Sequence, residues 1–275
     1  MKEKMLVVVL GVLVSIGAVS AFTIDGDLSD WGVDLSGDWS LNETWVPNGG
    51  IYFKVEDNQN PLLASTYTGV HIEGWGASYH FYNEPKVMTK DGRWVLEPFG
   101  GEKYDFEAIY LTQDADYIYV AIVTSNSPEV PPDHDYMVGD LGIDLNSDRQ
   151  YEYGVKLGKT TPGISQFDIY QNPSWKSAEW VPDNSPTYFY DGTKIGEATG
   201  AYKKTVQDQG KDNWVIELAI PKSVLGVQGF VPYNAFHITD RCGNDHVPVP
   251  EFPTVLIPML LVAGGYLGLR RRMRE

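Results

Sequence analysis

The residues best suited to binding a ligand lie in a short polar stretch near the middle of the chain. Asp144, Asn146 and Asp148 place oxygen-bearing side chains at alternate positions, and Glu152 follows them. Calcium takes six to eight oxygen ligands and accepts irregular loops, so this spacing predicts a calcium site. It is not an EF-hand, because Arg149 stands where that motif needs glycine. Asp and Asn are also ordinary turn residues, and a polar turn without an ion is the commoner explanation.

Three tryptophans lie where the sequence predicts loops. Trp75 stands between Gly74 and Gly76, and Trp175 and Trp180 lie in a stretch rich in proline and asparagine. Exposed indole rings can stack on sugar rings while nearby amides and carboxylates bind the hydroxyls, which makes these three the candidate carbohydrate-binding residues. The alternative is that they pack as lids on the folded body. The remaining tryptophans are predicted to pack in the core or at its edge: Trp31, Trp39, Trp45, Trp94 and Trp214.

The sequence offers little for catalysis. The five histidines are scattered, and none lies in an HExxH motif or beside a GxSxG serine. Cys242 is the only cysteine, so no internal disulfide can form, and the neighbouring Arg241 is weak evidence for an activated thiolate. The sequence therefore predicts a protein that is not an enzyme.

The N-terminus has the pattern of a secretory signal peptide. Residues 1–21 combine lysines near the start, an apolar run and small residues at the end. Cleavage is expected between Ala21 and Phe22. The apolar run is short for a membrane span, which needs about 20 residues. We expect residues 22–247 to form the exported domain.

The C-terminal tail, residues 248–275, carries the second apolar segment. Residues 252–269 contain no charge and would reach about 27 Å as a helix, and we expect that helix to cover about 254–269. The basic end at 270–275 should stay in the cytoplasm, which places the domain outside the cell.

A short motif precedes the apolar run and a basic cluster follows it. The residues are Pro250, Glu251, Phe252 and Pro253 before the run, and Arg270, Arg271 and Arg272 after it. In this order of parts the tail resembles the PEF-CTERM sorting signal of archaeal surface proteins. The resemblance implies recognition by an archaeosortase, a membrane transpeptidase that cuts near the motif and passes the protein to a lipid anchor. Whether the helix is retained as a membrane anchor or removed stays open.

The charge excludes one class of partner. The formal net charge is −16, and such a surface repels nucleic acid. Asn42 begins an N-glycosylation sequon that ends at Thr44, which hints at a surface loop.

Between the two apolar ends, short runs alternate apolar and polar residues between Gly, Pro, Asn and Asp clusters, and long helical periodicity is missing. This pattern predicts an all-β fold, an antiparallel β-sandwich in a single domain. The segments 137–145 and 151–157 should form a hairpin around the polar loop. The expected strands are 51–55, 69–72, 78–82, 106–111, 117–123, 137–145, 151–157, 167–170, 214–220 and 235–239.

A series of short motifs runs through the domain: IDGDLSDW at 24–31, YDFEA at 104–108, DYIYVA at 116–121, GDLGID at 139–144 and ELAIP at 217–221. In these motifs and their order the domain resembles carbohydrate-binding family 9 and DOMON-like sandwiches. The resemblance implies sugar binding and structural calcium, as in the first group, or b-type haem held by Met and His or Lys, as in some DOMON-like domains. Haem ligands could come from Met88, Met137, His80 and His134.

Taken together, these features predict a cell-surface binding module for carbohydrate or another envelope polymer, with calcium as a structural support. A haem-binding electron-transfer protein and a purely structural envelope protein are the alternatives.

Overall fold

The computed structural model describes the part of the chain that the sequence predicts to be the exported domain. The predicted signal peptide, Asn42, Trp180 and the C-terminal tail at 248–275 lie outside the described residues. Within the described residues, no helix is long and apolar enough to cross a membrane. The described ranges are 22–36, 43–56, 70–83, 87–88, 94–95, 105–128, 137–159, 161–178, 186–208 and 211–241.

The largest element is an antiparallel sheet of seven strands, in the order β14-β15-β7-β6-β1-β2-β3. Its centre is the hairpin of β6 and β7, whose residues are almost all buried. Both faces of these strands read as β-branched, aromatic or small side chains, which is typical of a sheet covered on both sides. The strands are β1 (Tyr52–Glu56), β2 (Val70–Trp75), β3 (Ser78–Asn83), β6 (Phe106–Gln113), β7 (Tyr117–Thr124), β14 (Thr199–Asp208) and β15 (Lys211–Pro221).

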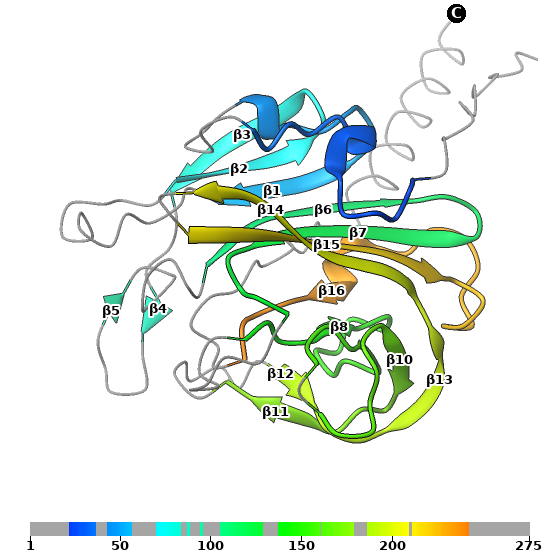
Figure 1. Cartoon of the computed structure of the whole chain (residues 1–275). Coiled ribbons are helices and arrows are strands. Elements are labelled where there is room, and N and C mark those ends of the chain that lie inside the picture. The colour runs from blue at the N-terminus through cyan, green and yellow to red at the C-terminus, as the bar shows by residue number, and fades with distance from the viewer. Residues whose placement is uncertain are drawn as a thin grey trace, which may run out of the picture.

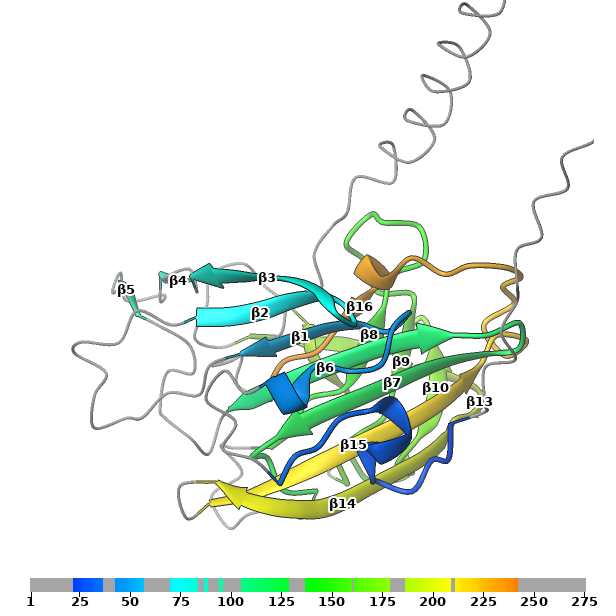
Figure 2. The same cartoon turned by 90° about the horizontal axis from the view of Figure 1, so that it is seen from above.

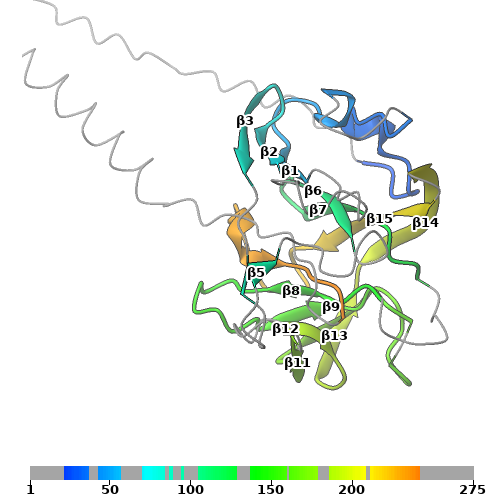
Figure 3. The ribbon, with the colours of Figure 1, turned by 90° about the vertical axis from the view of Figure 1, so that its left-hand side faces the viewer.

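A second antiparallel sheet has five shorter strands in the order β13-β10-β9-β8-β16. It lies below the large sheet in Figure 1, and Figure 3 shows the same two layers from the side. Its strands are β8 (Leu141–Ile143), β9 (Tyr153–Val155), β10 (Asp168–Gln171), β13 (Thr193–Glu197) and β16 (Phe236–His237). Two separate two-stranded ribbons pair β11 (Trp175–Ser177) with β12 (Pro186–Phe189), and β4 (Val87–Met88) with β5 (Trp94–Val95).

The main core fills the space between the two sheets. Ile118, Val120 and Ile122 alternate along one face of β7 and pack against a cluster that includes Leu141 and Val155 of the small sheet. Each such aliphatic side chain contributes about 1.5–3 kcal/mol when fully buried. One continuous core therefore joins the two layers.

A second core covers the outer face of the large sheet, under the N-terminal segment. This segment, blue in Figure 2, contains the 3₁₀ turns η1 (Leu28–Trp31) and η2 (Glu43–Trp45). Trp31 is wholly buried, and its indole Nε1 donates to Glu217 Oε1 at 2.8 Å. Burial raises the pKa of Glu217, and hydrogen bonds from Trp31, Gly26 and Asp25 oppose that rise. Glu217 of the large sheet thus provides specific hydrogen-bond acceptors for the N-terminal segment.

A buried ion pair ties the small sheet to β12. Lys156 Nζ lies 2.8 Å from Asp140 Oδ2, and both side chains are at most 1% exposed. The same ammonium donates to Thr161 Oγ1 and to the Phe189 carbonyl. The Asp140 carboxylate also accepts the N–H groups of Leu157 and Phe189. Nearly every polar atom of the pair therefore has a partner.

The prediction of an antiparallel all-β body is confirmed, and so is the hairpin, because β8 pairs with β9. Three predicted strands are too long. The segment 137–145 keeps only β8, 151–157 keeps only β9, and 235–239 keeps only β16, preceded by the 3₁₀ turn η4 (Tyr233–Ala235). Trp75 and Trp175 were expected in loops, but Trp75 is the last residue of β2 and Trp175 lies on β11. The prediction also missed β4, β5, β12, β13 and β14.

Candidate functional site: an acidic loop beside a tryptophan

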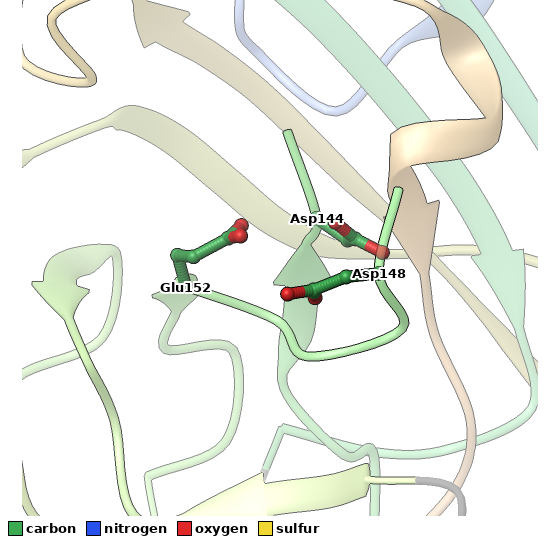
Figure 4. A group of neighbouring side chains, drawn as sticks. All are labelled: Asp144, Asp148 and Glu152. Atoms are coloured by element: carbon green, nitrogen blue, oxygen red, sulfur yellow. The ribbon is translucent and has the colours of Figure 1, made fainter. Parts of the chain in front are cut away.

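The predicted ligand loop connects β8 to β9, and Figure 4 shows its three carboxylates. Asp144 leaves β8 with its N–H donating to the Ala235 carbonyl at 2.7 Å, which anchors the loop to η4. Its carboxylate accepts the N–H groups of Ser147 and Arg149, both at 2.7 Å. The side chain is only 6% exposed, so Asp144 forms the inner wall of the loop.

The three carboxylates that the sequence singled out come together. One oxygen each from Asp144, Asp148 and Glu152 lies within 4.8 Å of the other two. Glu152 also accepts the Leu145 N–H at 3.0 Å and the side-chain amide of Asn146. Carboxylates this close repel one another, and an oxygen-binding cation would relieve that repulsion.

The loop holds this shape with two residues in the left-handed region. Ser147 has φ 62° and Arg149 has φ 65°, although neither is glycine. Such a conformation costs a non-glycine residue about 1–3 kcal/mol. Hydrogen bonds from both N–H groups to the Asp144 carboxylate offset that cost.

The same loop forms one wall of a pocket of about 440 Å³. Trp175 stands on the other wall, so the pocket brings together the two kinds of residue that the sequence proposed for calcium and for sugar. The full lining is Asn146, Asp148, Arg149, Gln150, Tyr151, Glu152, Asn172, Pro173, Trp175 and Pro186.

Trp175 is held rigidly in that wall. Its indole Nε1 donates to the Tyr151 carbonyl at 3.0 Å, and its ring packs edge-on against Phe189 with 5.4 Å between centroids. The residue is half-buried. The indole therefore serves the packing of the small sheet and also presents part of its surface to the pocket.

Trp75 lies outside the lining of this pocket. It is 38% exposed, and its ring contacts Tyr52 and Tyr233 with centroids 5.6 and 5.3 Å apart. The packing role predicted for Trp31 and Trp45 is confirmed, because each is at most 1% exposed.

The sequence missed most of the pocket wall, including Gln150, Asn172 and Pro173. The positions of Asn172 and Pro173 beside the acidic loop depend on the pairing of β9 with β10, which no local pattern shows.

Of the four candidate haem ligands, the structure describes the side chain of Met137 alone. Met137 is wholly buried, and Arg241 Nη1 lies 3.7 Å from its sulfur. His80 lies on β3 and Met88 on β4, but their side chains are not described, and His134 lies outside the described residues.

Comparison with known proteins adds no relative: no protein-family model, no curated protein and no solved structure matches this chain.

Proposed function

We propose that this chain is an exported, non-catalytic binding protein that holds a glycan of the cell envelope or its surroundings. The observation that carries the proposal is the pocket that Trp175 lines together with an acidic and amide-rich loop. An aromatic surface opposite several hydrogen-bonding groups is the usual composition of a sugar site.

Each wall of the pocket has its own part in this proposal. The exposed part of the Trp175 ring stacks on the apolar face of a sugar ring. Asp148, Gln150 and Asn172 exchange hydrogen bonds with its hydroxyls. Calcium, held by Asp144, Asp148 and Glu152 with Asn146 beside them, is the structural support that keeps the loop closed.

The proposed setting is the outer surface of an archaeal cell. The N-terminal signal exports the chain, and the PEF-CTERM tail anchors it as a helix or, after archaeosortase processing, through a lipid. The stacked sheets are proposed to be a β-sandwich of the DOMON-like or carbohydrate-binding family 9-like type. Intact-mass analysis of the native membrane form tests this setting, because retained residues 1–21 or a tail without cleavage or membrane association would contradict it.

Affinity gel electrophoresis tests the binding function. Soluble β-glucan, mannan and xylan are cast into separate gels, and at least one is expected to retard the folded protein. Trp175→Ala should weaken retention about tenfold, or ~1.4 kcal/mol, and Gln150→Ala should weaken it without removing a packed ring. Tyr190→Ala is the matched control, because Tyr190 is an exposed aromatic outside this pocket. Normal migration in all three gels would contradict the proposal.

Calcium has a separate test. Free Ca²⁺ at 100 times its dissociation constant should stabilise the protein by about 2.7 kcal/mol, seen as a higher unfolding temperature that EDTA reverses. Asp148→Asn combined with Glu152→Gln should abolish this shift, whereas Asp191→Asn, an exposed aspartate elsewhere, should keep it. An equal shift in all three proteins would place calcium somewhere else.

A further inference from the structure

A row of exposed aromatic residues begins beside the proposed sugar pocket. In the described part of the chain four large apolar side chains are more than a third exposed: Trp75, Tyr117, Tyr190 and Phe230. Three of them have neighbours that place them along one edge of the molecule.

Trp75 and Phe230 share one support. Tyr233 of η4 is 7% exposed, and its ring centroid lies 5.3 Å from that of Trp75 and 5.4 Å from that of Phe230. The Tyr233 ring itself stacks on Tyr52 of the large sheet at 5.9 Å. The two exposed rings are therefore held by a buried aromatic base, which is how a rigid stacking platform is built.

Tyr117 belongs to a second pocket, of about 610 Å³, at the turn between β6 and β7. Its floor is Lys222, whose ammonium donates to the carbonyls of Asp114 and Gly229, each at 2.7 Å. Asp116, Ser223 and Gln228 add hydrogen-bonding groups to the lining. Like the first pocket, it combines an aromatic ring with polar side chains.

One short segment connects these features. Gly229 lines the second pocket, Phe230 and Tyr233 form the platform, and the Ala235 carbonyl accepts the Asp144 N–H of the acidic loop. The seven residues 229–235 cannot reach more than about 25 Å even when fully extended. Figure 2 shows this segment, in orange, running along the edge of the molecule to the loop between β8 and β9. This one segment therefore links the second pocket, the platform and the acidic loop of the first pocket, and together we call them the row.

We propose that this row is an extended binding site for a linear, neutral polysaccharide, held along several consecutive sugar rings instead of at one end. The inference rests on the proposed function, because the acidic-loop pocket is one end of the row. Consecutive rings lie over Trp175, Trp75, Phe230 and Tyr117. The polymer is neutral because the carboxylates of Asp144, Asp148 and Glu152 keep a net negative charge even with one calcium ion bound, and Asp116 at the other end also repels anionic sugars.

The test compares chain lengths in the full exported domain. The hexasaccharide and the disaccharide of whichever polymer is retained in the gels are titrated by calorimetry. The hexasaccharide should bind at least tenfold more tightly. Phe230→Ala and Tyr117→Ala should each remove about fivefold or more of the hexasaccharide affinity and leave disaccharide binding within about twofold. Tyr190→Ala, which removes an exposed ring outside both pockets, should change neither affinity.

Three results would overturn the extended site. Equal affinity for the two oligosaccharides would indicate a site for one chain end only. Wild-type hexasaccharide binding in Phe230→Ala and Tyr117→Ala, combined with loss in Trp175→Ala, would refute the row but leave the proposed function intact. Binding of the wild-type protein, but not of Phe230→Ala, to neutral phosphatidylcholine vesicles would assign the exposed rings to a membrane surface. If no polysaccharide is retained at all, the proposed function itself fails.

Discussion

Lys156 and Asp140 form an ion pair that is almost completely shielded from solvent. Burying two charges costs several kcal/mol per ion, and their attraction offsets this only when the remaining hydrogen-bonding positions are filled. Here they are filled by Thr161, by the Phe189 carbonyl and by two backbone N–H groups. The pair is therefore a structural clamp, in which each charge is stable in the interior only while the other is present.

Replacing one partner should expose that dependence. Lys156→Met leaves a buried carboxylate without its counter-charge and should lower the free energy of unfolding by about 3–5 kcal/mol, measured by urea denaturation. Lys204→Met is the control, because the Lys204–Asp212 pair is more than 40% exposed on both sides and should cost at most about 1 kcal/mol. Equal losses in the two variants would contradict the clamp.

Asp114 should make stability depend on pH. Partial burial raises its pKa, but hydrogen bonds from the Tyr117 and Asp116 N–H groups and the Tyr119 hydroxyl, together with the Lys222 charge, outweigh this, and the net pKa is lowered. A lowered folded-state pKa means that ionised Asp114 stabilises the fold above about pH 3.9, the value for a free aspartate, and that this contribution is lost as the pH falls through the folded-state value.

Asp114→Asn isolates that contribution, because asparagine keeps one oxygen for the turn N–H groups. At pH 7 the variant should be less stable by about 0.5–1 kcal/mol. The gap to wild type should narrow as the pH falls below about 4. Thermal unfolding over a pH series measures it, and a gap that stays constant down to the acid limit would show that the charge contributes nothing.

The acidic loop shows which part of the candidate site could be predicted from residue spacing. Asp144, Asp148 and Glu152 are separated by a few positions within one hairpin loop, so their convergence follows from local geometry and could be predicted. Trp175 lies opposite them only because β11 pairs with β12 and the indole bonds the Tyr151 carbonyl. That placement depends on long-range pairing, which residue spacing does not encode.

At the scale of elements, the chain crosses from the small sheet to the large one at a single residue. Ala198 separates β13 from β14, and its N–H donates to the Phe167 carbonyl. Phe167 adopts φ 70°, and its ring lies over Gly200, where an added Cβ would come within 2.5 Å of it. The crossing therefore needs glycine at position 200.

Gly200→Ala should destabilise the protein by about 1–3 kcal/mol through overpacking, measured by chemical denaturation. Phe167→Gly removes the ring and suits a positive φ, so the double variant should lose less than the sum of the two single variants. Gly49→Ala controls for the loss of glycine, because an added Cβ meets nothing within 4 Å there and Gly49, like Gly200, has no positive φ. Strict additivity at 167 and 200 would contradict the contact.

The strands that were predicted differ in chemistry from those that were missed. β6 and β7 are rich in β-branched and aromatic residues, and their hairpin fixes both ends. Their predicted bounds therefore lie within two residues of the observed ones. β14 is an edge strand with exposed Lys203 and Lys204, and β13 is largely exposed. Charges on edge strands protect against unwanted pairing, and they also hide the alternation that identifies a strand.

At the scale of the whole molecule, the large sheet is covered on both faces, but by different kinds of structure. The inner face meets the small sheet, whereas the outer face meets an irregular segment that includes Phe22, whose ring centroid lies 4.4 Å from that of Trp31 and 5.1 Å from that of Tyr119. The sequence predicts that the exported chain starts at Phe22. The first residues after the signal would then complete the second core.

Removing residues 22–35 should therefore uncover Phe53, Tyr110 and Val215 on the large sheet. Loss of the apolar contacts should cost about 5 kcal/mol or more, which is comparable to the stability of many domains. Trp31→Ala should cost about 3–5 kcal/mol and Ser29→Ala, an exposed position in the same segment, almost nothing. Calorimetry and binding of a hydrophobic dye measure the series. A truncated protein that unfolds at the wild-type temperature and binds no dye would show that the segment is only a covering, and that the outer face is stable without it.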